Sequence, residues 1–429
     1  MKTHTKFKQT EIGMIPEDWE VKKVEELGKI ITGKTPKTAD KDNFGKDYPF
    51  ITPRDMSGQK NIKNTERYLS KKGKDSVKNC LLPAKSIAVS CIGSDMGKVV
   101  MTTGESVTNQ QINSVIPHSV SADFIYYSLL NISDLIRNLG KQSTAVPIMN
   151  KSQFSKLKIA IPNDLLEAEC AAKILSDLDS KIELNQQMNK TLEAIGQALF
   201  NHWFIDFELP IEKGKPYRSS GGEMVDSELG EIPKGWQVRK VGEVIDIFGG
   251  TTPSTKEPKY WEGGTIHWAT PKDLSELDSP ILIDTERKIT PQGLATISSG
   301  LLPAGTVLLS SRAPIGYTAI LQVPVSINQG FIAMVCNHEL PNYYVFSWVQ
   351  YYMDVIKSVA SGTTFEEVNK SNFRRLNILV PPSGPISKFS IIFGSLYEYI
   401  LNNSFQSRTL VSVRDSLLPR LMSGQIRVR

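Results

Sequence analysis

The sequence contains one ordered set of short motifs twice. Residues 12–19 (IGMIPEDW) return as residues 229–236 (LGEIPKGW), and residues 150–154 (NKSQF) return as residues 369–373 (NKSNF). The offset between matching landmarks stays between 217 and 220 residues along the whole chain. Chance does not hold register in this way, so a tandem duplication of two units of about 215 residues accounts for nearly all of the 429 residues. Any fold of this chain must therefore contain two similar halves.

The motifs between these landmarks recur in the same order. They are Gly33 and Pro36 with Gly250 and Pro253, residues 52–55 (TPRD) with 270–273 (TPKD), residues 65–67 with 285–287 (both TER), residues 81–84 with 301–304 (both LLPA), and residues 109–110 with 328–329 (both NQ). Short apolar runs such as Ser86–Ser90 and Gly305–Leu309 lie between turn signals and predict strands. Helical patterns at Asp123–Leu139 and Tyr343–Val359 follow, so each unit begins with a mixed α/β domain.

A long helix is expected after each mixed domain. Asn163 or Asp164 caps the first helix and Ser383 caps the second, and apolar residues then form a seam at three- and four-residue steps. The seam residues are Leu175, Leu178, Ile182, Leu192 and Leu199 in the first helix, and Phe389, Ile392, Leu396, Tyr399, Leu410, Val413 and Leu417 in the second. About forty residues make each helix roughly 60 Å long.

The economical way to cover both seams is for the two helices to pack on each other as a coiled coil. Duplication suggests pseudo-two-fold symmetry, which makes the pair antiparallel. Asn185 and Asn403 lie near the middle of the seams, where either a polar pair fixes the register or the two side chains are simply exposed. The expected architecture is α/β (α+β), with mixed domains at residues 1–162 and 227–381, helical segments at 163–208 and 382–429, and a polar, glycine-rich linker at 209–226.

Composition narrows the class of protein. The chain has 50 Lys and Arg against 45 Asp and Glu, a net charge of +5 that permits nucleic-acid binding without demanding it. The four cysteines form no CxxC pair, so neither a disulfide framework nor a structural zinc is expected. No apolar run is long enough to span a membrane and no apolar segment follows the N-terminus, so we expect no membrane partner and a cytoplasmic location.

Two segments match catalytic motifs, but the key residues of each motif are missing from the other repeat. Residues 28–35 (GKIITGKT) match the P-loop pattern that binds nucleotide phosphates, but Pro36 follows at once and the second copy lacks the lysine. Residues 284–288 (DTERK) resemble a metal-dependent nuclease core, but the first copy keeps only TER, which favours a structural ion pair. We therefore expect no catalytic residue, no metal site and no bound cofactor. The alternative is a nucleotide-dependent enzyme, which only residues 28–35 support.

The polar landmarks indicate recognition instead. Lysines attract phosphates, Asn and Gln amides can read adenine edges, and arginine can read guanine. The DNA-binding candidates in the first domain are Lys34, Arg54, Lys60, Lys63, Lys71, Lys72, Ser90, Asn109, Gln110 and Gln111; those in the second are Lys256, Lys259, Trp261, Lys272, Ser311, Arg312, Tyr317, Asn328 and Gln329. The alternatives are a solvated surface for the lysines and turn caps for the amides. Because the loops differ between copies while the framework recurs, the two domains look like readers of two different sequences.

The chain resembles the DNA specificity subunits of type I restriction-modification systems. The resemblance is carried by residues 12–21 and their second copy, by residues 203–207 (WFIDF) after the first helix, and by residues 417–428 (LLPRLMSGQIRV), and it extends over essentially the whole chain. It implies that the mixed domains are target recognition domains, each reading one half of a split, asymmetric site in double-stranded DNA. It also implies that the helical segments set the spacing and dock two methyltransferase (modification) subunits.

The resemblance further implies a division of the chemistry. This chain would supply specificity and no catalysis, while adenine methylation with S-adenosylmethionine and restriction with ATP and Mg would belong to modification and restriction subunits. Base-contacting residues do not carry over, because those loops vary within the family. The alternative is a duplicated coiled-coil scaffold that binds protein and no DNA, and it predicts no salt-dependent affinity for DNA.

Overall fold

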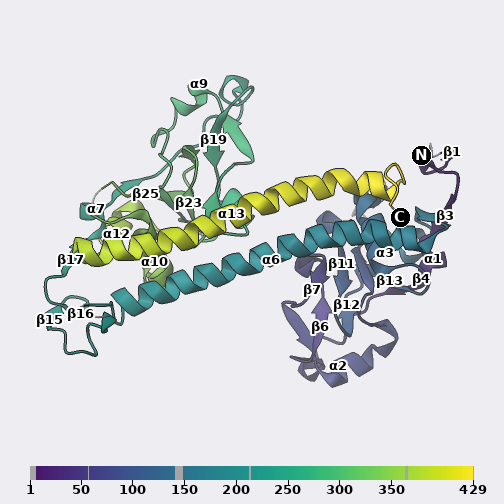
Figure 1. Cartoon of the computed structure of the whole chain (residues 1–429), viewed down its shortest axis with the longest axis horizontal. Helices are drawn as coiled ribbons and strands as arrows, with labels where there is room; N and C mark the ends of the chain where they lie inside the picture. Colours follow the sequence, from purple (N-terminus) through teal and green to yellow (C-terminus); the bar gives the residue numbers. More distant parts are fainter. Residues whose placement is uncertain are drawn as a thin grey trace. The chain divides into compact units, whose positions relative to one another are not determined.

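The computed structural model describes residues 6–56, 58–140, 148–211, 214–337, 339–362 and 366–428. The chain divides into two compact units: unit 1 comprises Met1–Glu183 with Ser407–Arg429, and unit 2 comprises Leu184–Gln406. Both boundaries fall inside the long helices α6 (Leu165–Phe204) and α13 (Ser383–Met422) (Figure 1). Each unit therefore holds one mixed domain, part of the helix that follows this domain, and part of the other helix.

Unit 1 is built on two five-stranded mixed sheets. The first has the strand order β4-β13-β10-β11-β7 and the second β5-β8-β6-β12-β9. Their bounds are β4 Gly28–Thr32, β5 Phe44–Gly45, β6 Tyr48–Ile51, β7 Asn61–Ile62, β8 Arg67–Leu69, β9 Leu81–Leu82, β10 Ile87–Ser90, β11 Val99–Thr102, β12 Ser106–Thr108 and β13 Ile112–Pro117. Two further antiparallel pairs join β1 Phe7–Thr10 to β2 Gly13–Pro16, and β3 Trp19–Lys23 to β14 Lys158–Pro162. The helices are α1 Val24–Leu27, α2 Lys71–Ser76, α3 Ala122–Asn131, α4 Ser133–Gly140 and α5 Lys151–Ser155.

Unit 2 repeats this plan. Its five-stranded sheet has the order β18-β25-β22-β23-β20, which matches the first sheet of unit 1, and its second sheet is β21-β19-β24. The strands are β15 Met224–Ser227, β16 Gly230–Pro233, β17 Gln237–Lys240, β18 Asp246–Phe248, β19 Ile266–Ala269, β20 Ile281–Leu282, β21 Arg287–Ile289, β22 Val307–Ser310, β23 Thr318–Leu321, β24 Val325–Ile327, β25 Phe331–Val335 and β26 Asn377–Val380. The helices are α7 Val241–Val244, α8 Pro271–Ser275, α9 Pro291–Leu294, α10 Asn342–Tyr351, α11 Met353–Ser358 and α12 Lys370–Arg374.

The central strand of each first sheet explains why its sequence is apolar throughout. Side chains alternate between the two faces of a strand. In β10, Ile87 and Val89 join the cluster beneath α3, whereas Ala88 joins the cluster on the opposite face with Ile51 and Val100. Strand β22 divides its side chains between two clusters in the same way. Both faces are therefore buried, and the two predicted strands are confirmed.

The helical patterns expected at Asp123–Leu139 and Tyr343–Val359 each form two helices rather than one. The chain turns at Ile132, between α3 and α4, and at Tyr352, between α10 and α11. The first helix of each pair is buried over most of its length, whereas the second buries mainly one apolar side chain, Ile136 in α4 and Ile356 in α11. The apolar spacing alone does not reveal the turn.

The two long helices contact each other in both units, and the contacts of unit 2 show their direction. In unit 1, Arg414 of α13 donates to Asp179 of α6 at 2.8 Å. In unit 2, a Cβ at Gly196 of α6 would lie 2.6 Å from the Phe393 ring of α13. Within unit 2, Asn185 of α6 bonds Gln406 of α13 while Gly196 faces Phe393, so residue numbers rise along α6 as those of α13 fall, which confirms the expected antiparallel pair (Figure 1). Asp164 caps α6 by accepting the backbone N–H of Leu166 at 3.0 Å, as expected.

The heptad register expected for the second helix is wrong by one residue at Ile392 and Tyr399, whereas Phe389 is buried as expected. Ile392 is 42% exposed and Tyr399 is 63% exposed, whereas Phe393 and Ile400 are buried. Residues 391–393 are all apolar, so the sequence does not show which of them faces the core. In the structure Phe393 faces it, where its ring packs on Tyr343 of the mixed domain with centroids 5.3 Å apart. Among the described residues, no helix combines the length and apolar character needed to cross a membrane.

Candidate nucleic-acid interface

Three recurring motifs meet on the surface of unit 1. The backbone of Gly33 runs so close to the turn after β12 that a Cβ there would lie 2.2 Å from the carbonyl oxygen of Asn109. The Thr35 hydroxyl donates to the side-chain oxygen of Gln110 at 2.7 Å. The backbone N–H of Asn109 donates to the carbonyl of Ile51 at 3.0 Å, which places the turn beside the TPRD motif. We call residues 33–36, 52–55 and 109–111 the corner of unit 1.

Unit 2 has the same corner, formed by residues 250–253, 270–273 and 328–330. A Cβ at Gly250 would lie 1.8 Å from the carbonyl oxygen of Ile327, so only glycine fits there. The Thr252 hydroxyl donates to the side-chain oxygen of Gln329 at 2.6 Å. The backbone N–H of Asn328 donates to the carbonyl of Ala269 at 3.1 Å. The recurring motifs thus form one surface arrangement that is present twice.

This geometry rejects a P-loop at residues 28–35. Residues Gly28–Thr32 form β4, which pairs antiparallel with β13, and no helix begins in the described residues 33–40. A P-loop needs a helix whose N-terminal amides face the phosphates. The glycine, threonine and proline of this motif instead build the corner.

The TPRD, TPKD and TER motifs hold one another. Asp55 accepts bonds from the backbone N–H and the hydroxyl of Thr52 through one carboxylate oxygen, and from the backbone N–H of Glu66 at 2.8 Å through the other. Asp273 makes the same three bonds with Thr270 and Glu286. The aspartate therefore holds the TER turn against the corner in both units. Among the described residues, no group of three side chains that could ligate a metal occurs.

The arginine of TER stacks on aromatic rings, and this corrects the expected ion pair. The Arg67 guanidinium lies 4.2 Å from the centroid of Phe44, and the Arg287 guanidinium lies 3.5 Å from the centroid of Trp261. A cation over an aromatic face is attracted by the ring quadrupole. The ion pair of this motif in unit 2 involves Glu286, which accepts from Lys272 at 2.8 Å.

The asparagines of the two NQ motifs are turn caps. The Asn109 side-chain oxygen accepts the backbone N–H of Gln111 at 3.1 Å, and the Asn328 side-chain oxygen accepts that of Gly330 at 2.8 Å. Both bonds span two residues, as in an Asx turn. The structure therefore supports the capping alternative for Asn109 and Asn328, whereas Gln110 and Gln329 remain exposed at the surface.

The candidate cations divide by their partners. Lys34, Arg54, Lys71, Lys256 and Lys259 are exposed. Carboxylates lie beside four of the exposed candidate lysines: Lys63 pairs with Glu183, Lys72 with Asp40 and Asp42, Lys259 with Glu257, and Lys272 with Glu286. Hydrogen bonds to Asp40 and Asp42 raise the pKa of Lys72, and a hydrogen bond to Glu286 raises that of Lys272. Lys34, Arg54, Lys71 and Lys256 are left as the exposed candidates that pair with no carboxylate among the described residues.

Three candidates in unit 1 and unit 2 are not at the surface. Ser90 and Ser311 are 0% and 2% exposed, so neither hydroxyl can reach a base. The Lys60 side chain is 6% exposed and pairs with Asp123. Near Ser311, Arg312 and Tyr317 are partly exposed, and the Arg312 guanidinium lies 3.8 Å from the Glu367 carboxylate.

Lys60 instead anchors the mixed domain of unit 1 to its helices. Its ammonium donates to the Ser176 hydroxyl of α6 at 2.9 Å and lies 4.7 Å from the ring centroid of Tyr127. The Tyr127 hydroxyl donates to Asp179 of α6 at 2.6 Å, and Arg414 of α13 donates to the same carboxylate. Burial and the Asp179 carboxylate raise the pKa of Tyr127. A charged network therefore connects the domain to both helices.

Unit 2 makes the corresponding connection without a cation, through neutral side chains and one carboxylate. The side-chain amide of Gln322 donates to the Tyr397 hydroxyl of α13 at 3.2 Å, and this hydroxyl donates to the carbonyl of Pro280 at 3.4 Å. Phe393 of α13 packs on Tyr343, and Gln186 of α6 donates to Asp278 at 2.8 Å. Burial raises the pKa of Tyr397. The two units thus share an architecture and differ in the chemistry of the anchor.

A polar layer joins α6 and α13 in unit 2. Asn185 donates to the side-chain oxygen of Gln406 at 2.9 Å, Asn403 donates to that of Asn189 at 2.9 Å, and Asn189 donates to the Ser404 hydroxyl at 3.3 Å. Asn185 and Asn189 are 0% and 3% exposed. The paired alternative for Asn185 and Asn403 is therefore correct, although each bonds a side chain other than the one expected. The sequence analysis missed Asn189 and Ser404 as members of this layer.

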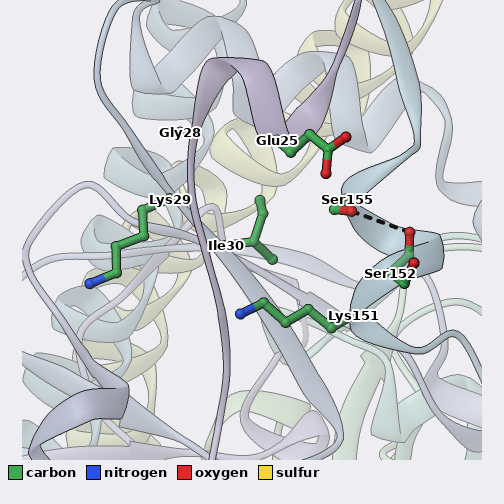
Figure 2. A pocket seen from close by; sticks show the side chains of 7 residues that line it. All are labelled: Glu25, Gly28, Lys29, Ile30, Lys151, Ser152 and Ser155. Atoms are coloured by element: carbon green, nitrogen blue, oxygen red, sulfur yellow. Dashed lines mark hydrogen bonds between the residues drawn. The ribbon is translucent and has the colours of Figure 1, made fainter.

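One open hollow lies beside the first sheet of unit 1. Glu25 of α1, Lys29 and Ile30 of β4, and Lys151 and Ser152 of α5 line it (Figure 2). The Ser155 hydroxyl donates to the carbonyl of Ser152 at 3.2 Å and is thereby occupied within its own helix. This lining offers two ammonium groups and one carboxylate to solvent, which suits a hydrated surface rather than a catalytic site.

The sequence analysis also missed a clamp near the C-terminus. The Arg427 guanidinium donates to both carboxylate oxygens of Asp18, at 2.9 and 2.7 Å, and to the 3% exposed Glu167 of α6. Hydrogen bonds to Glu167 and Asp18 raise the pKa of Arg427. Such a forked pair is geometrically specific. The basic residue in the tail was visible in the sequence, but its partners lie 260 and 409 residues away.

The fold and the surface define a duplicated recognition protein, in which a recurring framework presents two different sets of loops on an antiparallel helix pair. The family model for the type I restriction modification DNA specificity domain matches residues 16–194 and residues 233–391. The chain therefore belongs to the type I restriction-modification DNA specificity family. As a specificity subunit it is non-catalytic, and catalysis belongs to other subunits of such systems.

Individual relatives agree with this assignment. The MjaIX specificity subunit of Methanocaldococcus jannaschii is 29% identical over 99% of this chain and 97% of its own length. The HindI specificity subunit of Haemophilus influenzae is 38% identical over 78% of this chain and 83% of its own length. The crystal structure of the S subunit of a type I restriction-modification system from M. genitalium has a TM-score of 0.53 at 15% identity, covers 94% of this chain and 96% of its own, and has the same fold.

Proposed function

We propose that the mixed domains, residues 1–162 and 227–381, are target recognition domains that each read one half of a split, asymmetric DNA site. Segments 163–208 and 382–429 set the spacing between the halves, and residues 209–226 link the first helical segment to the second mixed domain. The observation that carries this proposal is the pair of equivalent corners beside loops that differ. A scaffold that binds only protein has no use for two different surfaces on one framework.

The geometry reduces the set of DNA contacts that we propose. Lys60, Ser90 and Ser311 are buried and are withdrawn, and Asn109 and Asn328 serve as turn caps. The proposed contacts are Lys34, Arg54, Lys71, Gln110, Gln111, Lys256, Lys259, Trp261, Arg312, Tyr317 and Gln329. Lys63, Lys72 and Lys272 would exchange their carboxylate partners for phosphates. Contacts that recur in both domains position the duplex, and contacts that do not recur discriminate its sequence.

The exposed side of the helices supports docking of modification subunits. In unit 2, Leu184, Met188 and Ile195 of α6 are 48%, 39% and 49% exposed, and their spacing places them on one helical face. On α13, Ile391 and Tyr399 are 71% and 63% exposed. Exposed apolar rows of this kind mark protein interfaces.

Unit 1 carries its own exposed apolar residues on these helices. Leu166 and Ile174 of α6 are 59% and 37% exposed, and Val413 of α13 is 40% exposed. We therefore assign one modification subunit to each unit. S-adenosylmethionine, and the ATP and Mg of restriction subunits, would be bound by these partners and not by this chain.

The test is an adenine methylome. Cells that express this chain with its methyltransferase subunit are compared with cells that express the methyltransferase alone. We expect a two-part, gapped methylated motif that depends on this chain. A methylome that is the same with and without the chain, together with no salt-dependent DNA affinity of the assembled complex, would favour the protein-binding scaffold.

Replacing one domain tests the division of labour. Exchange of the loops of unit 2 for those of a homologous specificity subunit should alter one half of the motif and leave the other half and the gap length unchanged. The matched control exchanges the loops of unit 1 and should alter the opposite half. Changes in both halves from a single exchange would contradict modular recognition.

A further inference from the structure

The two corners place identical side chains at equivalent surface positions of domains that are proposed to read different sequences. Thr35 with Gln110, and Thr252 with Gln329, form the same hydrogen bond at 2.7 and 2.6 Å. A residue that is the same in both readers cannot carry the difference between two half-sites. It can hold the framework, or it can contact the part of DNA that is the same in every sequence, which is the phosphate backbone.

The hydrogen bond within the corner decides what the glutamine can offer. Bidentate recognition of adenine uses the amide oxygen as acceptor and the amide nitrogen as donor at the same time. In both corners the threonine hydroxyl holds the amide oxygen on the protein side. The threonine takes one of the two lone pairs of the amide oxygen and fixes its direction, while both N–H donors of the amide nitrogen stay available. An amide held in this way offers its donors more readily than a paired acceptor and donor, which favours a phosphate oxygen over an adenine edge.

The surroundings of the glutamine make it a rigid donor. Gln110 and Gln329 are exposed, but each follows an Asx turn that its neighbouring asparagine closes. The glycine of each corner allows the threonine loop to approach the turn, since a Cβ at Gly33 or Gly250 would overlap a carbonyl oxygen. The corner is thus ordered before DNA arrives, and little side-chain entropy is lost on binding.

Positive charge lies in the same corner. Arg54 follows Pro53 in the TPRD motif and is exposed, and Lys272 occupies the matching place in the TPKD motif. In unit 2 two carboxylates lie near the ammonium of Lys272, Glu286 at 2.8 Å and Glu276 at 3.8 Å. The corner of unit 1 is therefore the more positive, and the test relies on Arg54 and the two glutamines.

We propose that the corners are two equivalent, sequence-independent contacts to DNA phosphates, made by the side-chain N–H groups of Gln110 and Gln329 and assisted by Arg54 in unit 1. This inference rests on the proposed function, because it requires that both domains bind DNA. It replaces the earlier expectation that these glutamines read bases. Sequence discrimination is then left to residues that do not recur, such as the partly exposed Arg312 and Tyr317 of unit 2.

The experiment measures DNA affinity and the methylated motif of the complex assembled from the full chain and its modification subunits. The variants are Gln110→Ala, Gln329→Ala and Gln110→Glu, and the probes are a duplex with the native motif and a duplex with a scrambled motif. We expect each alanine variant to lower the affinity for both duplexes by the same factor, about 5- to 10-fold, with the methylated motif unchanged. Gln110→Glu keeps an oxygen acceptor for Thr35 but replaces the donors with a negative charge, so its loss should be larger.

Arg54→Ala supplies a second measurement. Loss of one phosphate contact should reduce the slope of log affinity against log salt concentration by about one. A changed base in one half of the motif for Gln110→Ala or Gln329→Ala would overturn the proposal, because it would make the glutamine a base reader. Unchanged affinity for Gln110→Glu in a folded complex would assign the corner to the framework alone and would also overturn it. If the unmodified complex shows neither DNA affinity nor a motif, the proposed function itself fails.

Discussion

Replacement of Glu193 by glutamine should stabilise unit 2 at alkaline pH. Glu193 lies on α6, and its Oε1 atom is buried without a hydrogen-bond partner among the described residues. Burial raises the pKa of Glu193 to about 7, and the neighbouring Lys190 only partly opposes this effect. The ionised carboxylate is therefore a cost that the folded protein bears above neutral pH. Glutamine keeps the size and the polarity of the side chain and removes the charge.

The size of the effect follows from the pKa. A carboxyl group whose pKa rises from 4.5 to about 7 on folding loses roughly 3 kcal/mol of stability when it is fully ionised. Because the side chain keeps some contact with solvent, screening reduces this to about 1–2 kcal/mol. The folded state binds the proton more tightly than the unfolded state, so stability falls as pH rises from 4.5 through 7. We expect Glu193→Gln to be more stable by about 1–2 kcal/mol at pH 8 and nearly neutral at pH 5.

The assay is urea unfolding of the full chain followed by tryptophan fluorescence at several values of pH. Five of the six tryptophans (Trp203, Trp236, Trp261, Trp268 and Trp348) lie in Leu184–Gln406, so the signal reports mainly on unit 2. The matched control is Glu398→Gln, which removes an exposed carboxylate from α13.

The pH dependence of the difference between variant and wild type decides the outcome. A stabilisation by Glu193→Gln that is equal at pH 5 and pH 8 would refute the titration argument, because it would arise from packing. A destabilisation at pH 8 would show that the carboxylate has a favourable partner in solution.

Two further predictions concern the helices. Lys60→Met should lower the free energy of unfolding of unit 1 by about 2–4 kcal/mol, because it leaves Asp123 without its cation. The control Lys71→Met, at an exposed position, should change this free energy by less than about 0.5 kcal/mol. Thermal unfolding measures both variants, and equal effects would contradict the role of Lys60 as an anchor. Asn189→Leu should lower the free energy of unfolding by about 1–3 kcal/mol, because Asn403 loses its acceptor. Adding Asn403→Leu should recover part of that loss, which urea unfolding of the single and double variants measures as a double-mutant cycle. Strictly additive losses would show that the two side chains do not interact.

Internal repetition made the large features of the fold predictable. The offset between the copies indicated two units, and alternation within them predicted β10 and β22, because a strand buried on both faces needs a continuous apolar run. The pairing of the long helices was predictable because each has an apolar seam that must be buried, and their antiparallel direction was predictable from the duplication. Its register did not follow, because residues 391–393 are all apolar and only contact with Tyr343 selects Phe393.

The candidate site was harder to predict, since the sequence does not distinguish a surface lysine from one that the fold buries. Lys60 stood in a lysine-rich stretch with Lys63, Lys71 and Lys72, yet its ammonium belongs to a network with α6. Ser90, at the end of β10, and Ser311, directly after β22, are polar residues that the fold buries. Recurrence was the better guide, because Gln110 and Gln329 keep the same bond in both copies.

The anchors limit how far the duplication makes the units interchangeable. Residues 60 and 280 occupy matching places before β7 and β20, and residues 179 and 397 occupy matching places on α6 and α13. In unit 1 these places hold Lys60 and Asp179, which are members of one charged network. In unit 2 they hold Pro280 and Tyr397, and the Tyr397 hydroxyl donates to the Pro280 carbonyl. A domain of unit 1 moved alone onto the helices of unit 2 would keep the pair of Lys60 with Asp123 but would lose Ser176 and Asp179 as partners of Lys60 and Tyr127, at a cost of about 1–3 kcal/mol for each buried group left without its bond. Exchange of loops therefore preserves the fold, and exchange of whole domains requires the matching halves of α6 and α13 to move with them.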